Sequence, residues 1–109
     1  MTEDSTKDEY EDVIAQYYKG EKIHSLITLK VDTQEVDNIA NAVTEMNNVN
    51  DVFLVTGDTD MVLGTVFNSY KELKDFIIDN LGALRGVKET NTLMIVSTYK
   101  KSGIKIEAD

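Results

Sequence analysis

The chain has 109 residues, enough for one domain with its own hydrophobic core, and it contains no cysteine, which excludes disulfides and thiolate metal sites. Its formal net charge of −9 argues against autonomous binding to DNA, whose phosphates attract lysine and arginine. No apolar run approaches the roughly 20 residues of a membrane span, and the acidic N-terminus does not resemble a targeting signal, so we expect a cytoplasmic protein without membrane contact.

Residues 1–22 differ in composition from the rest and form an acidic N-terminal arm. Residues 1–12 hold six acidic side chains and one lysine, a net charge of −5, which leaves −4 for the other 97 residues. Residues 9–19 predict a short helix, because apolar side chains recur at helical spacing: Tyr10, Val13, Ile14, Tyr17 and Tyr18. We expect the acidic part to be solvated, Tyr17 and Tyr18 to pack on the body, and residues 23–109 to form one domain.

The first half of that domain predicts a strand, a helix and a hairpin. Ile23–Val31 alternates as a strand, with every second residue from Ile23 on one face. An amphipathic helix follows over Thr33–Met46, with Thr33 as its N-cap. Val49–Thr56 and Asp60–Phe67 are predicted strands, joined by a tight turn at Gly57, Asp58 and Thr59.

The second half predicts one more helix and one more main strand. Ser69 caps the helix, and Gly82 or Gly86 ends it. Its inner stripe is Tyr70, Leu73, Ile77, Leu81 and Leu84, with Phe76 beside it. Thr90–Lys100 is the predicted last strand, centred on residues 93–96, and Ile104 and Ile106 are expected in a short edge strand.

The element order β-α-β-β-α-β predicts an α+β, ferredoxin-like fold: a four-stranded antiparallel sheet with two helices on one face. A sheet covered on one side should alternate apolar and polar residues, yet adjacent apolar residues occur at Val52 and Phe53 and at Met61 and Val62. Both faces are therefore apolar. Because two helices cover only one face, the pattern predicts a homodimer whose sheets pack face to face, as in a dimeric α/β-barrel.

Several short motifs, in order, resemble the C-terminal effector domain (RAM domain) of Lrp/AsnC transcription regulators. The run Thr56-Gly57-Asp58-Thr59-Asp60 is similar to the family's Thr/Ser-Gly-Asp-x-Asp turn, except that an aromatic residue usually stands where Thr59 is. Residues 84–92 resemble the start of the family's last strand, and residues 49–52 resemble the opening of its second strand, with Asn48 where proline is usual. The resemblance covers roughly residues 23–107.

The resemblance implies a module that binds a small effector, most simply an amino acid, and that assembles as a dimer and in rings of dimers. The implied ligand-binding residues are Leu54, Thr56, Gly57, Asp58, Asp60, Tyr70, Thr92 and Leu93. We expect no cofactor and no catalytic residue, and the net charge of −9 argues against direct DNA contact. Residues 1–22 are too short for the family's DNA-binding head, so we expect a stand-alone effector domain, or a piece of a longer regulator, that pairs with a full-length regulator.

The turn also has a purely structural interpretation. A hairpin turn with Asp58 as a turn former and Asp60 in solvent explains the same residues without a ligand. His24, the one histidine, is expected on a strand surface, because a lone histidine without cysteine is a poor start for a metal site or a triad.

Two other classes share this strand order. A small enzyme of the dimeric α/β-barrel kind would need a closed polar cavity, to which His24 and Tyr99 would have to point. An ACT-like regulatory domain would join its sheets side by side. The scarcity of polar residues on the strands favours the effector module over the enzyme.

Overall fold

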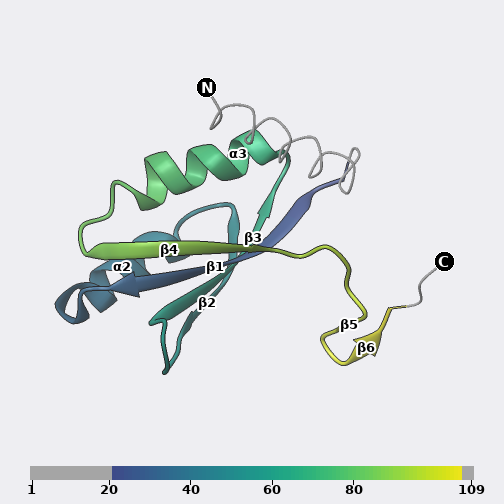
Figure 1. The fold of residues 1–109 in the computed structure, drawn as a ribbon, viewed down its shortest axis with the longest axis horizontal. Helices are drawn as coiled ribbons and strands as arrows, with labels where there is room; N and C mark the ends of the chain where they lie inside the picture. The colour runs from purple at the N-terminus through teal and green to yellow at the C-terminus, as the bar shows by residue number, and fades with distance from the viewer. Residues whose placement is uncertain (1–20, 107–109) are drawn as a thin grey trace, which may run out of the picture.

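The computed structural model describes residues 21–106, which fold around a four-stranded sheet (Figure 1). The strands β1, β2, β3 and β4 are, respectively, Ile23–Val31, Val49–Leu54, Met61–Phe67 and Val87–Met94. They lie in the order β2-β3-β1-β4, and all neighbours are antiparallel. The helix α2 joins β1 to β2, and α3 continues into the π-helical segment η2 before β4. The predicted ferredoxin-like βαββαβ fold is confirmed.

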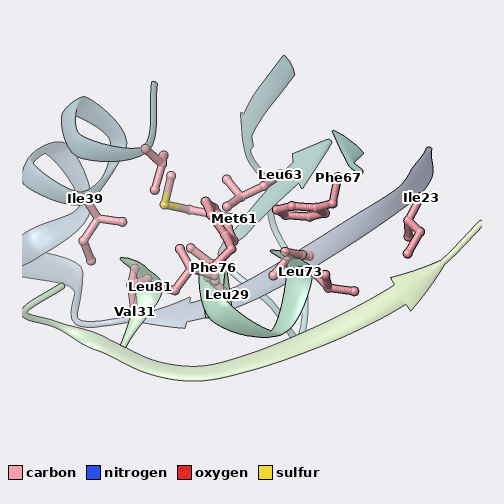
Figure 2. Packing of buried hydrophobic residues seen from close by; sticks show 12 residues of the cluster. Ile23, Leu29, Val31, Ile39, Met61, Leu63, Phe67, Leu73, Phe76 and Leu81 are labelled. Carbon is pink, nitrogen blue, oxygen red and sulfur yellow. The ribbon is translucent and has the colours of Figure 1, made fainter. Parts of the chain in front are cut away.

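One face of the sheet carries the hydrophobic core. In β1 the residues Ile23, Ile27, Leu29 and Val31 are buried, and their neighbours are mostly exposed, as the alternation predicted. Both helices pack on this face, so their buried side chains belong to the same cluster (Figure 2). The buried helical residues are Ile39 and Val43 of α2, Leu73 of α3, and Phe76 and Leu81 of η2. The second sheet face therefore has no cover from within the described chain.

A pair of hydroxyls lies within this apolar layer. Ser25 and Thr65 are opposite each other on β1 and β3, and each is almost fully buried. The Ser25 Oγ and the Thr65 Oγ1 are 2.7 Å apart, and the Thr65 hydroxyl also donates to the Ser25 carbonyl oxygen at 3.0 Å. The two groups thereby satisfy each other in a region without solvent.

The first helix starts differently from the prediction. Asp32, not Thr33, is the N-cap: its Oδ1 accepts from the backbone N–H of Gln34 at 3.1 Å, and residues Thr33–Glu35 form a 3-10 turn, η1. The α-helix proper, α2, is Val36–Thr44. The carboxylate of Asp32 is as good a cap as the Thr33 hydroxyl, and it is already in place where β1 ends.

The second helix keeps its predicted cap and inner stripe. The Ser69 Oγ accepts from the backbone N–H of Glu72 at 3.1 Å, and α3 is Tyr70–Asp75. The continuation η2, Phe76–Leu81, is π-helical and ends at Gly82. Phe76 is buried in the core, 5.2 Å from Phe67 between ring centroids, whereas Ile78 remains 59% exposed.

The last strand was predicted too late in the chain. β4 spans Val87–Met94 rather than Thr90–Lys100. Its bounds follow from its pairing with β1, in which Val31, the last residue of β1, pairs with Val87, and Ser25, near the start of β1, pairs with Met94. Beyond Met94 one further bond, from the Ile95 N–H to the His24 carbonyl oxygen at 2.9 Å, closes the pairing.

The C-terminal residues form a separate hairpin instead of an edge strand on the main sheet. Lys100–Lys101 (β5) pairs with Ile104–Lys105 (β6), and Figure 1 shows this hairpin apart from the four-stranded sheet. The predicted helix at residues 9–19 lies outside the described residues.

The open face of the sheet has an apolar centre and a polar margin. The strand register places Leu26, Phe53, Val62 and Leu93 together on it, and Leu26, Phe53 and Leu93 are 37%, 56% and 50% exposed. His24, Lys30 and Glu89 belong to the same face, nearer its ends, and all three are exposed. The predicted second apolar face is therefore confirmed for the sheet centre.

Candidate functional site

The turn between β2 and β3 is longer than predicted. The strands end at Leu54 and begin again at Met61, and the turn is closed by a bond of 2.8 Å from the Val55 N–H to the Asp60 carbonyl oxygen. Gly57 has a φ of 130°, which side chains other than glycine rarely adopt. Thr56, Gly57 and Asp58 are exposed, so this tip can meet a ligand or a second molecule.

Asp60 is hydrogen-bonded to the end of β1 and is only partly exposed. Its Oδ2 accepts a hydrogen bond of 2.9 Å from the backbone N–H of Val31, and its own N–H donates to the Leu29 carbonyl oxygen at 2.9 Å. The hydroxyl of Thr59 donates to the same carbonyl at 2.9 Å. The interpretation of Asp60 as a solvated turn residue is therefore wrong: Asp60 ties the turn to β1.

A polar cleft of about 310 Å³ lies beside this turn, over the ends of β1 and β4. Its charged lining residues are Lys30, Asp58 and Glu89, and Lys30 stands directly opposite Glu89 in the strand register. The other lining residues are neutral and polar: Thr28, Thr59, Thr90 and Asn91. An ammonium, two carboxylates, several hydroxyls and an amide can together hold a small zwitterion, whose own carboxylate and ammonium need opposite partners.

A second, mainly apolar groove of about 310 Å³ lies on the helical side of the sheet. It runs between α3 and η2 on one side and β4 on the other, and its lining residues are Tyr70, Leu73, Lys74, Ile77, Ile78, Thr92 and Met94. Lys74 carries the one charge among them.

The predicted ligand-binding residues do not meet in one pocket of a single chain. Asp58 lines the polar cleft, and Thr56, Gly57 and Asp60 are its neighbours in the turn. Tyr70 and Thr92 line the apolar groove instead. Leu93 lies on the open sheet face, and Leu54, 68% exposed, ends β2. A site that uses all of them needs more than one copy of the chain.

The sequence interpretation did not include Lys30, Glu89 and Asn91 in the site. The alternation of β1 already put Lys30 on the open face, but the register that brings Glu89 opposite to it and Asn91 opposite Thr28 depends on how β4 aligns with β1. That alignment is a tertiary contact, which a linear pattern does not contain.

Other kinds of site have little support within residues 21–106. In this described range there is no group of three or more His, Cys, Asp or Glu side chains that could hold a metal ion. His24 is exposed on β1, and Tyr99, 75% exposed, lies beyond the end of β4. None of the helices described is long and apolar enough to cross a membrane.

Comparison with known proteins agrees with this fold. Residues 25–104 match the family model described as the Lrp/AsnC ligand binding domain. The HTH-type transcriptional regulator PF1231 of Pyrococcus furiosus is 30% identical over 88 residues, which are 81% of this chain and 60% of that relative. The match thus spans less than two thirds of that regulator's length.

Solved structures show the same fold. The transcriptional regulator NMB0573 of Neisseria meningitidis, in complex with L-Met, superimposes with a TM-score of 0.71 at 20% identity over 75% of this chain and 55% of its own. TTHA0845 of Thermus thermophilus gives a TM-score of 0.68 at 26% identity over 72% of this chain and 99% of its own. The fold and the family match lead to one conclusion: this chain belongs to the Lrp/AsnC ligand binding domain family of transcriptional regulators.

Proposed function

We propose that the chain senses a small zwitterionic metabolite, an α-amino acid, at the polar cleft beside the Thr56–Asp60 turn. The observation that carries the proposal is the charge arrangement of the cleft, where Lys30 can face a carboxylate and Asp58 and Glu89 can face an ammonium. The backbone N–H of Gly57 has no hydrogen-bond partner within the described residues and lies at an exposed tip, so it is a further donor for a carboxylate.

The site we propose is completed by assembly. Since Tyr70 and Thr92 lie in a different groove from Asp58, a neighbouring copy that presents its groove to the turn would bring the two sets together. The open apolar sheet face supports a homodimer as the first step of that assembly, and rings of dimers as the second. Binding of the effector then changes how copies of the chain associate with one another, and this change in assembly is the signal that the module transmits.

In this proposal the chain has no catalytic role and makes no direct contact with DNA. A small enzyme of the dimeric α/β-barrel class would need a closed polar cavity, whereas His24 and Tyr99 are both exposed and line neither of the two clefts above. The net charge of −9 opposes binding to duplex DNA. We place the module in the cytoplasm, where it would bias the assembly of a full-length regulator of the same family.

The test is a panel of α-amino acids, beginning with L-methionine, in native mass spectrometry and then in calorimetric titration. We expect one or more members to bind, and Asp58→Asn to weaken the best of them by about 10- to 100-fold, the cost of one charge-assisted contact. Asp37→Asn is the matched control, because Asp37 is also an exposed aspartate but lies on α2. No binding at millimolar concentration, or equal affinity of Asp58→Asn and wild type, would refute the proposal.

A further inference from the structure

The apolar groove between α3–η2 and β4 is not covered by any other part of residues 21–106, and it leaves a large apolar side chain in solvent. Ile78 lies in it with 59% of its surface exposed, and Tyr70, Ile77, Thr92 and Met94 are only half-buried. An apolar groove of this kind is typically covered by an amphipathic segment.

The chain supplies such a segment close to one end of the groove. β1 begins at Ile23, whose register partner Phe67 is followed three residues later by Tyr70, one wall of the groove. Ser25 pairs with Met94, the other wall. The start of β1 therefore lies beside the groove, and a span of four residues such as 19–22 can cover up to about 13 Å.

The composition of the preceding residues fits the groove. Between residues 9 and 19 the apolar side chains that share one predicted face are Tyr10, Val13, Ile14, Tyr17 and Tyr18. Nine helical residues measure about 13 Å, which is comparable to the run of α3 and η2. The acidic residues Glu9, Glu11 and Asp12 accompany the stripe, and the one charged residue that lines the groove is a cation, Lys74.

Lys74 is the cation that remains available for this contact. Lys71, on the same helix, donates to the Asp75 carboxylate at 2.7 Å, and this hydrogen bond raises the pKa of Lys71. Lys74 has no ion pair within residues 21–106. We propose that residues 10–18 of the same chain pack their apolar stripe into the groove between α3–η2 and β4, with their acidic residues toward Lys74.

This docking has a consequence for sensing. Tyr70 and Thr92 line the groove and also belong to the proposed effector site, so a docked segment would shield them; that consequence rests on the proposed function. The docking itself does not, and it can be tested without any ligand.

The test is disulfide trapping. Because the chain has no cysteine of its own, only the two introduced cysteines can form a disulfide. The pair Tyr17→Cys with Ile78→Cys should form a disulfide within one chain under mild oxidation, since a bridge requires Cα atoms within about 7 Å. The control pair is Tyr17→Cys with Asp37→Cys, because Asp37 is exposed on α2. We expect the groove pair to react about tenfold faster or more, as a docked segment has a high effective concentration. Equal rates, or a disulfide mainly between chains on a non-reducing gel, would overturn the proposal.

A second measurement does not depend on cysteine chemistry. In a methyl-labelled sample of the full chain, Val13→Asp with Tyr17→Asp should shift the δ1-methyl resonances of Ile77 and Ile78. The resonance of Ile39, a buried residue of α2, should remain unchanged. Unchanged Ile77 and Ile78 resonances would contradict docking in the groove.

Discussion

The carboxylate of Asp60 accepts a hydrogen bond from the backbone N–H of Val31 at 2.9 Å, across 29 positions of sequence. Val31 lies at the bulge where the register between β1 and β4 shifts. On the other side of β1, the ladder with β3 ends at the pair Leu29 and Met61. The Asp60 carboxylate therefore gives the Val31 N–H an acceptor just beyond the end of that ladder, and it holds the β2–β3 turn against the end of β1.

From this contact we predict that Asp60→Ala destabilises the fold. The substitution leaves the Val31 N–H without its acceptor in a partly buried position, which should lower the free energy of unfolding by about 1–3 kcal/mol. Urea unfolding followed by circular dichroism measures it. A change of less than about 0.5 kcal/mol, the usual size for a surface site, would contradict the structural role.

Asp60→Asn separates structure from binding. The amide oxygen can still accept from the Val31 N–H, so we expect most of the stability to remain, while the negative charge near the turn is lost. If Asp60 also holds a ligand ammonium, the affinity for the best amino acid should fall by about tenfold or more, as measured by calorimetry. Unchanged affinity in a stable Asp60→Asn protein would leave Asp60 with a structural role only.

The buried hydroxyl pair makes a separate prediction. Thr65→Val keeps the side-chain shape but leaves the Ser25 hydroxyl without its partner at 2.7 Å, and we expect a loss of about 1–3 kcal/mol. The double variant Ser25→Ala with Thr65→Val removes both groups and should lose less than the sum of the two single variants. Strict additivity in thermal or urea unfolding would show that the two hydroxyls are not coupled.

Two glycines with positive φ form a matched pair for another prediction. A methyl group at Gly86, whose φ is 96°, would lie 2.6 Å from the Glu35 Cβ, whereas one at Gly57, whose φ is 130°, would meet nothing within 4 Å. Both alanine variants carry backbone strain of about 1–3 kcal/mol, but Gly86→Ala adds a steric clash. In urea unfolding we expect Gly86→Ala to be the less stable of the two, and the reverse order would disprove this explanation.

Much of the fold could be predicted from local patterns. The alternation of Ile23–Val31 and the cap at Ser69 depend on neighbouring residues only, and both are confirmed. The end of β4 depends on how far β1 extends, and the choice of Asp32 over Thr33 as a cap depends on where β1 stops. These are tertiary constraints, and a linear pattern does not contain them.

The candidate site was predictable in part for the same reason. The turn residues Thr56–Asp60 are contiguous, so a motif could indicate them. Lys30 and Glu89 meet through cross-strand register, and the Asp60 contact with Val31 spans two strands, so neither could be read from the order of residues. The separation of Asp58 from Tyr70 and Thr92 likewise became visible only in three dimensions.

The last prediction concerns the open sheet face, whose apolar centre is Leu26, Phe53, Val62 and Leu93. A face-to-face dimer should bury on the order of 1,200 Å² or more and should place this centre away from water. We therefore expect the wild-type chain to be dimeric at micromolar concentration, and Phe53→Glu with Leu93→Glu to dissociate it, because a buried unpaired carboxylate is costly. Both side chains are at least half exposed in the single chain, so the monomer should keep its circular dichroism spectrum.

Light scattering combined with sedimentation velocity reads the outcome. Ile78→Glu is the matched control: Ile78 is 59% exposed but lies on the helical side, so its substitution should leave the dimer intact. Side-by-side pairing of the ACT type would instead use an edge strand, β2 or β4, and would leave the sheet centre in solvent, so the double variant would remain dimeric. A wild-type monomer, or a double variant that stays dimeric, would contradict face-to-face packing. If the double variant dissociates and Ile78→Glu remains dimeric, face-to-face packing is supported, because only the substitutions at Phe53 and Leu93 change the apolar centre of the open face.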